Sequence, residues 1–569
     1  MDELREFSIT TKIISLNTRR TDLNLRPLSL PLRSVKRIFN NTRFLTLGFL
    51  LFAALITTVK LLRLSSRELW IDESYSALLS SMGWKQMFGF IVGDIHPPLY
   101  YMVLWGWVRI AGNSEAVLRL FSVLLSTAAL AAIFFVARKW LGTRAAVFVA
   151  VLFALSPMLY VYSLEVRMYM LAVLLTIAIL GLHRVVSSET EQSPLYLLLY
   201  AFGCALLYYT HYIGLFVIAG LFADWVLVAP WRSRSFRRLS IAALIVLFLT
   251  APWLPIMFHQ RSQKLAILQQ VNASILDPAS LAYGETIRSR SSLSVLSTHI
   301  RQDAVLAFGF YPTHPLPLKA LLGLPLAICL AGALWLAVRG DRICRLFVLV
   351  AIAVFCGMLQ MHVYELRYSL PLLPFLFLAI SRPLQQTEKP RERMIATALA
   401  VLIVATYAVG FVHQATRKYP RDWSTMVSTL KSQYRENDVI VFHPMMTQVL
   451  FDYYAGQVGF RPREIGFPQT IYSWWLTAPV KGWAPVAGTK NDLGSVAAEL
   501  KKRPQPSTVW LVLGNLLVSD PKGQLRARLE ETGEGRELKY ARILNTPSVN
   551  PPNLTLTPKI VAISAVQKK

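Results

Sequence analysis

Two acidic residues stand side by side in Trp70-Ile71-Asp72-Glu73, directly after an apolar run long enough to cross a membrane. Carboxylates at a membrane edge are costly to bury and are usually retained for a task. A carboxylate that is partly desolvated there gains proton affinity and can take a proton from a hydroxyl. The alternative is structural, because Asp and Glu also stabilise the first turn of a helix that follows them. Composition alone leaves both interpretations open.

A histidine precedes two prolines in Asp94-Ile95-His96-Pro97-Pro98, and Tyr100 follows shortly after. The prolines fix the backbone and indicate the start of a helix, a position that proline tolerates well. His96 therefore stands just ahead of a helix N-terminus. It could bind a phosphate or a metal there, or simply cap the helix, and a single histidine is more often structural.

A charged pair follows a later apolar run, in Glu165-Val166-Arg167-Met168-Tyr169. If the two side chains only pair with each other at an exposed rim, the pair contributes less than about 1 kcal/mol. In a functional interpretation Glu165 is a metal ligand and Arg167 contacts a phosphate.

Two further motifs end or begin apolar runs. His211 lies among tyrosines, a pattern typical of the aromatic belt at a membrane interface. Arg367-Tyr368 precedes a run that contains Pro371 and Pro374. An arginine at the mouth of a helix bundle can offer two donors to one phosphate, although it could also extend to lipid headgroups.

The composition shows what must position these residues. The chain has 569 residues, 54% of them hydrophobic, and a mean hydropathy of +0.44. The apolar residues gather into runs of roughly 17–25 residues, the length that crosses about 30 Å of hydrocarbon. Backbone groups in lipid must bond within their own segment, so each run predicts a helix. We expect about eleven spans, which begin near Arg43, Val117, Ala145, Met168, Leu195, Ile213, Ile241, Leu318, Leu346, Ser369 and Ile395.

The net charge of +27 does not indicate a nucleic-acid partner, because Lys and Arg cluster in short segments between the apolar runs. Basic clusters mark the cytoplasmic side, so the tail of residues 1–43 is expected inside. Every strongly basic short loop then also falls inside, provided that Pro98–Ala111 lies in the interface and does not span. That stretch is short, aromatic and carries Arg109, which favours an interfacial helix.

Two larger segments are expected outside the membrane. Residues 259–317 form a long external loop with an amphipathic helix near 293–308, and the first external loop covers about 65–116. Residues 416–569 become soluble in character and indicate a small α/β domain. A helix is expected there at 423–434 and strands at 438–442, 507–513 and 559–563. The four cysteines lie in or beside apolar runs and form no CxxC pair, so they predict neither a disulfide framework nor a zinc site.

This topology brings the residues that could carry out chemistry to one face of the membrane, although they are far apart in the sequence. A shared site explains that coincidence more simply than chance does. The members of the predicted site are Asp72, Glu73, His96, Glu165, Arg167, His211 and Arg367.

Together these motifs resemble the bacterial protein-mannosyltransferase-like family, part of the C-type glycosyltransferase superfamily that includes the lipid A aminoarabinose transferases. The resemblance covers roughly residues 44–415, the transmembrane domain, in the order and topology of the motifs. It implies a mainly α polytopic helix bundle in the plasma (inner) membrane, with the C-terminal domain on the periplasmic or extracellular side. It also implies inverting transfer of a sugar, mannose or another hexose or pentose, from a polyprenyl-phosphate donor to a lipid, polysaccharide or protein acceptor.

The resemblance also implies roles for individual residues. Asp72 would be the catalytic base, with Glu73 beside it, and Glu165 would occupy the second acidic position, where some relatives carry Asp. The remaining candidates are His96, Arg167, Arg367 and Tyr368 near the donor phosphate, and Tyr100, Tyr169 and His211 elsewhere in the site. The requirement for a divalent metal differs among relatives and stays open.

Two other function classes compete with a glycosyltransferase. A secondary transporter is less favoured, because charged groups gather at one rim and no paired broken helices stand out. A non-catalytic membrane scaffold or sensor predicts that substitution of Asp72 or Glu165 leaves the phenotype unchanged.

Overall fold

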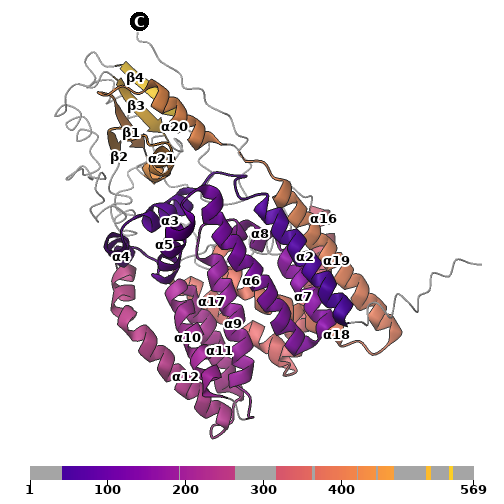
Figure 1. Ribbon diagram of the computed structural model, residues 1–569. Helices are drawn as coiled ribbons and strands as arrows, with labels where there is room; N and C mark the ends of the chain where they lie inside the picture. The colour runs from indigo at the N-terminus through magenta and orange to yellow at the C-terminus, as the bar shows by residue number, and fades with distance from the viewer. Residues whose placement is uncertain are drawn as a thin grey trace, which may run out of the picture.

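Long helices form a bundle that carries a small α/β unit at one end (Figure 1). The computed structural model describes residues 42–190, 193–262, 316–361, 366–419, 421–443, 446–466, 508–513 and 537–542. Most of the basic tail, most of the expected 259–317 loop with its helix at 293–308, and the expected strand at 559–563 lie outside the described residues.

Each of the apolar runs predicted from the sequence falls on a helix. By length and hydropathy, six helices among the described residues could cross a membrane, or seven when the bent pair α7–α8 counts as one span. The exact count of about eleven therefore stays a prediction. The helices are α2 (Thr42–Leu61), α6 (Glu115–Leu141), α7 (Thr143–Leu155), α8 (Pro157–Ser163), α9 (Tyr169–Val186), α10 (Pro194–Thr210), α11 (Ile213–Val228), α12 (Arg234–Thr250) with η1 (Ala251–Trp253), α16 (Leu316–Val338), α17 (Arg342–Met361), η3 (Leu366–Leu372) with α18 (Leu373–Gln385), and α19 (Pro390–Thr416).

The break between α7 and α8 has a local cause. Pro157 cannot continue the backbone hydrogen bonds of α7, but it suits the first position of a new helix. The Ser156 side chain caps that helix by accepting from Leu159 N at 3.3 Å, and the two helices meet at 59°. The loop that follows α8 carries Glu165 and Arg167, so this bend sets their position at the end of the bundle.

Three short helices lie at the end of the bundle next to the α/β unit (Figure 1): α3 (Ile71–Ser81), α4 (Trp84–Gly93) and α5 (Leu99–Ala111). The stretch expected to lie in the interface is α5. Its 13 residues give a length of about 20 Å, too short for a membrane span. Arg109 near its end donates to Ser80 O of α3 at 2.8 Å, which ties the two short helices together.

The turns that carry the clusters of Arg and Lys lie at the end of the bundle opposite α3, α4 and α5. Arg345 at the start of α17 donates to Asp224 near the end of α11 at 2.8 Å. Arg238 of α12 donates to Ser188 O after α9 at 3.0 Å. Basic turns and candidate site residues thus lie at different ends, as the topology predicts, while the side of the membrane that each end faces stays a prediction.

The α/β unit contains a four-stranded parallel sheet with the order β2-β1-β3-β4. Its elements are α20 (Asp422–Gln433), β1 (Val439–His443), α21 (Met446–Gln457), β2 (Glu464–Gly466), β3 (Thr508–Leu513) and β4 (Glu537–Arg542). The apolar residues of β1 and β3 are buried, as expected for inner strands of a parallel sheet. Helix α20 and strands β1 and β3 lie where the sequence predicts them, whereas α21, β2 and β4 were not predicted.

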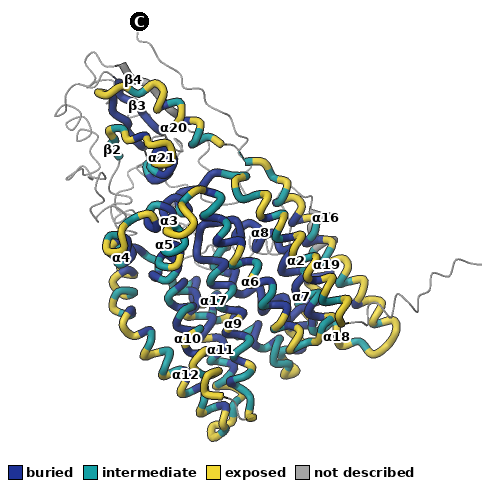
Figure 2. Tube along the Cα trace, in the orientation of Figure 1, coloured by how far each residue is buried: buried dark blue, intermediate teal, exposed yellow. Residues whose placement is uncertain are grey.

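Burial follows the bundle, with buried residues inside and exposed apolar residues on the outer helices (Figure 2). Leu50, Leu244 and Val401 are large, apolar and exposed, which suits contact with lipid. A close backbone contact between two helices involves Gly220 of α11, where a Cβ would lie 2.6 Å from Val350 Cα of α17. Small residues allow such close approach between helices in membranes.

We expect Gly220→Ala to lower thermal stability in detergent, because the added methyl group meets backbone atoms of α17 that cannot rotate away. Gly48→Ala is the matched control: Gly48 lies on the exposed side of α2 with open space around it, and a helical Gly→Ala change gains up to about 1 kcal/mol. Equal unfolding temperatures of the two variants would contradict this packing.

Candidate active site

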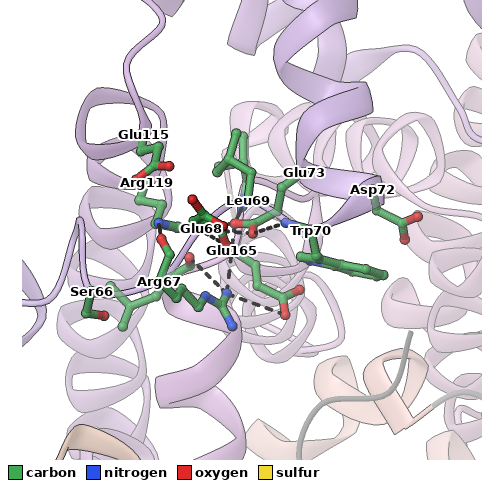
Figure 3. Close-up of polar contacts among 12 residues, drawn as sticks. Ser66, Arg67, Glu68, Leu69, Trp70, Asp72, Glu73, Glu115, Arg119 and Glu165 are labelled. Atoms are coloured by element: carbon green, nitrogen blue, oxygen red, sulfur yellow. Dashed lines mark hydrogen bonds and ion pairs between the residues drawn. The ribbon is translucent and has the colours of Figure 1, made fainter. Parts of the chain in front are cut away.

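The two adjacent carboxylates both lie in the first turn of α3, and one of them, Glu73, caps this helix. Glu73 accepts from the backbone N–H of Trp70, the N-cap residue, at 3.2 Å. Successive residues on a helix point about 100° apart. The side chains of Asp72 and Glu73 therefore face different surroundings, with Asp72 pointing away from the polar network around Glu73 (Figure 3).

Glu73 is enclosed by protein, with no exposed surface. Arg119 of α6 binds it with two nitrogens, Nη2 to Oε2 at 3.1 Å and Nε to Oε1 at 3.3 Å. Val166 N also donates to Oε1 at 3.0 Å. The structure thus places Glu73 in a buried ion pair that joins α3, α6 and the loop after α8, and not beside the carboxylate of Asp72.

Arg119 does more than neutralise Glu73, and the sequence reasoning missed it. Its guanidinium also donates to three backbone carbonyls of the segment before α3: Leu64 O at 3.0 Å, Arg67 O at 2.6 Å and Glu68 O at 3.0 Å. A single arginine inside an apolar run was the available signal, because ionisable residues in spans are rare and usually functional.

Asp72 is the partly exposed member of the pair, with 19% of its side chain accessible. Arg367 Nη1 donates to Oδ2 at 2.9 Å, and Arg167 Nη2 lies 3.9 Å from the same oxygen. Burial by itself raises the pKa of the Asp72 carboxyl, but Arg167, Arg367 and His96 outweigh that effect and hold the pKa below its usual value. The expected gain in proton affinity is therefore wrong for this state, because two guanidinium groups face the carboxylate.

Arg167 is buried and held from several sides. Its Nη1 donates to Tyr101 OH at 3.1 Å and to Ser76 Oγ at 3.2 Å. Its Nη2 lies 3.2 Å from His96 Nε2. An arginine fixed in this way presents its charge in one direction, toward Asp72.

His96 connects Arg167 to a residue that the sequence reasoning did not select. Its Nδ1 lies 3.2 Å from the buried Asp94 Oδ2, and Tyr101 OH lies 3.5 Å from the same oxygen. Since the arginine must be the donor to Nε2, the partners assign the proton of a neutral ring to Nδ1. Burial lowers the pKa of His96, which agrees with a neutral ring. His96 thus orients Arg167.

Aromatic rings enclose Arg367. Its guanidinium carbon lies 5.3 Å from the ring centroid of Trp70, 5.8 Å from Tyr368 and 6.0 Å from Tyr169. His211 continues this wall, with its ring centroid 4.9 Å from Tyr368 and 6.3 Å from His96. The structure thus brings together Asp72, His96, Arg167, Tyr169, His211, Arg367 and Tyr368. Tyr100 is fully buried and packs against Phe121 of α6 and against Tyr101, the partner of Arg167.

Glu165 is buried on the Arg67 side of this region (Figure 3). Arg67 Nη2 lies 3.6 Å from Glu165 Oε1 and 3.8 Å from Glu73 Oε1, so one guanidinium serves two carboxylates. Glu165 Oε2 has no hydrogen-bond partner among the described residues. Burial raises the pKa of Glu165 to about 7, because Arg67 and Arg367 compensate only in part and Glu73 and Asp72 add to the rise.

The side chains that could bind a metal ion do not form a metal site in the part of the chain that the structure describes. No three His, Cys, Asp or Glu side chains come together there. The acidic candidates Asp72 and Glu165 each face a guanidinium, whose positive charge disfavours a divalent cation at the same place. We therefore assign no step to a metal.

We expect Arg119→Leu to destabilise the protein by about 3–5 kcal/mol, because it leaves the Glu73 carboxylate buried without a counter-charge. Chemical unfolding in a fixed detergent would measure the loss, and Arg119→Leu combined with Glu73→Leu should recover part of it. Arg391→Leu, at an exposed arginine in the first turn of α19, serves as the control. An Arg119→Leu protein that unfolds like the wild type would contradict this assignment.

The raised pKa of Glu165 predicts a pH dependence of stability. The folded state binds this proton more tightly than the unfolded chain, whose carboxyl has a pKa near 4.5. The contribution of Glu165 to the free energy of unfolding is therefore greatest below about pH 4.5, falls as the pH rises to about 7, and then levels off. Between pH 5 and 8 the wild type should lose unfolding temperature relative to Glu165→Gln. Parallel curves for the two proteins would exclude this shift.

Residues 95–256 match the model of a family described as dolichyl-phosphate-mannose-protein mannosyltransferase. This region includes His96, Glu165, Arg167 and His211. No curated protein sequence matches the chain significantly.

Among solved structures, the chain is similar to ArnT from Cupriavidus metallidurans in the apo state, with 15% identity, 80% of this chain and 91% of that chain covered, and a TM-score of 0.55. It is also similar to the same protein bound to undecaprenyl phosphate, with 15% identity, coverage of 77% and 89%, and a TM-score of 0.49. A third similar structure is archaeal oligosaccharyltransferase AglB from Archaeoglobus fulgidus with an inhibitory peptide and a dolichol-phosphate, with 12% identity, coverage of 87% and 69%, and a TM-score of 0.49.

At this identity the apo ArnT comparison shows a shared fold over most of the chain. The family match over the middle of the chain covers the motifs around His96 and Glu165. Both findings agree with the resemblance seen in the motifs: residues 95–256 are similar to the dolichyl-phosphate-mannose-protein mannosyltransferase family, and the fold of the chain is similar to that of ArnT.

Proposed function

We propose that this protein is a membrane enzyme that transfers a sugar from a polyprenyl-phosphate donor to an acceptor, with inversion, and that Asp72 is the catalytic base. The observation that carries the proposal is the partly exposed Asp72 carboxylate between Arg367 and Arg167 at one end of a helix bundle. A polyprenyl donor also agrees with the matching family, which is named for a dolichyl-phosphate mannose donor.

The arginines are the proposed phosphate contacts. In the described state the N–H group at Arg367 Nη1 points to the Asp72 carboxylate. A donor phosphate would compete with Asp72 for the guanidinium of Arg367, because guanidinium groups bind phosphate oxygens with paired N–H donors. Once the phosphate takes Arg367, Asp72 loses a partner that lowers its pKa. Its proton affinity then rises, so that donor binding makes Asp72 a stronger base.

The chemical step follows from this exchange. The acceptor hydroxyl gives its proton to Asp72, and its oxygen attacks the anomeric carbon from the side opposite the lipid phosphate. The bond between the anomeric carbon and the phosphate oxygen breaks, and the phosphate leaves with the bonding electrons. Arg167 and Arg367 stabilise the negative charge that remains on the lipid phosphate.

The other site residues support this arrangement. His96 and Asp94 keep Arg167 oriented through the chain of contacts from Asp94 to the guanidinium. The rings of Trp70, Tyr169 and Tyr368 limit where Arg367 can move. Glu165 remains our candidate for the second acidic position, and the donor sugar belongs to the hexose or pentose class.

The reconstituted protein should consume one donor in a panel of polyprenyl-phosphate sugars that covers mannose, other hexoses and pentoses. Asp72→Asn should lower kcat by about 10²–10⁴-fold, the usual contribution of a general base. Asp341→Asn is the matched control, because Asp341 is also bound to an arginine, Arg382 at 2.6 Å, but lies at the opposite end of the bundle. Parallel reactions with EDTA and with added Mn²⁺ measure any metal requirement.

Wild-type turnover by a folded, membrane-inserted Asp72→Asn protein would remove Asp72 from the base role. Solute flux in proteoliposomes without glycosyl transfer would instead favour a secondary transporter. No donor consumption and no flux, with an unchanged phenotype for Asp72→Asn in cells, would favour a scaffold or sensor.

A further inference from the structure

The α/β unit contacts the segment that leads directly into α3. This segment, residues 62–70, joins α2 to the helix that carries Asp72. Within it, the buried Glu68 carboxylate accepts from two backbone N–H groups at the start of α20, Trp423 N and Ser424 N, each at 2.8 Å. The first N–H groups of a helix lack partners within the helix and favour a negative charge. A side chain next to the bundle therefore caps a helix of the α/β unit.

In a second contact, a side chain of the α/β unit binds groups that belong to the bundle. The Tyr454 hydroxyl of α21 accepts from Leu69 N at 2.7 Å and donates to Glu115 Oε1 at 2.6 Å. Glu115 begins α6, and its other oxygen accepts from Arg421 at 3.1 Å. One hydroxyl thus links α21, the segment before α3 and the start of α6. Because Leu69 is fully buried, its N–H needs such an acceptor.

The same segment is held from its other side by Arg119. The carbonyls of Leu64, Arg67 and Glu68 all accept from that guanidinium. Between Arg119 and Tyr454 the backbone of residues 64–69 is fixed from two directions, and Asp72 follows three residues later. Helix α21 also packs directly against α3.

From this geometry we infer that the α/β unit is a positioning part of the active site. Tyr454 and Glu68 are positioning residues: they fix the segment before α3, so that Asp72 meets Arg367 and the donor in one orientation. The catalytic part of this inference rests on the proposed function, whereas the coupling between the α/β unit and α3 does not.

Tyr454→Phe in the full-length protein in lipid nanodiscs tests the coupling. Amide hydrogen exchange in Ile71–Ser81 should rise, because removal of the hydroxyl frees the segment that anchors α3. With the donor that the wild type consumes, kcat should fall about fivefold to tenfold, the scale of one lost hydrogen bond, with a smaller change in KM.

Tyr434→Phe is a matched control. The Tyr434 hydroxyl makes the same pair of contacts inside the α/β unit, donating to Asp438 O at 2.7 Å and accepting from Arg463 N at 2.9 Å. Its removal should raise exchange near residues 435–438 and at Arg463, inside the α/β unit, and leave both α3 and kcat unchanged. Equal effects of both variants on α3 would show general loosening of the α/β unit and overturn the inference.

Glu68→Ala is a second, independent variant, with Glu392→Ala as its control. Glu392 also accepts from two backbone N–H groups at a helix start, Glu388 N and Lys389 N, but in α19 at the far end. Glu68→Ala should raise exchange in α3, and Glu392→Ala should not. Unchanged exchange in α3 for both Tyr454→Phe and Glu68→Ala would refute the coupling. Raised exchange in α3, with no donor consumed by the wild type, would support the coupling and refute the proposed function.

Discussion

The outer part of the structure depends on the ion pair between Glu73 and Arg119. Both side chains are fully buried, at 0% exposure, so either charge alone would carry a large desolvation penalty. Their mutual contact and the backbone groups around them satisfy most of their hydrogen-bonding capacity. As a result, α6, the start of α3 and the loop after α8 cannot separate without exposing a buried charge. This constraint fixes the direction in which Asp72 leaves the helix.

Adjacent carboxylates in the sequence thus have separate tasks in the structure. Glu73 holds the elements together, whereas Asp72 remains partly exposed among arginines that also suit a phosphate. The low pKa of Asp72 fits a resting state in which the carboxylate stands where a ligand anion would bind. Arg167 needs its own support, and Tyr101, Ser76 and His96 supply it.

The α/β unit belongs to the same arrangement. Its helices contact the segment between α2 and α3 through Glu68 and Tyr454, and α21 packs on the helix that carries Asp72. The basic turns, by contrast, lie at the far end, where Asp224 accepts from Arg345. The molecule therefore has one end where buried arginines face carboxylates, and another built around basic turns that suit a cytoplasmic surface.

The sequence by itself determined the helices of the bundle and the gathering of Asp72, His96, Arg167 and Arg367 at one end. These follow from local rules: hydropathy over one span, helix start signals, and alternation of basic turns. Only the tertiary structure decided that Glu73 faces Arg119, that Asp94 and Tyr101 join the site, and that the pKa of Asp72 falls. The partner of Glu73 lies 46 residues away and that of Asp72 lies 295 residues away. Electrostatic interactions depend on distance in space, and packing of the whole bundle sets those distances.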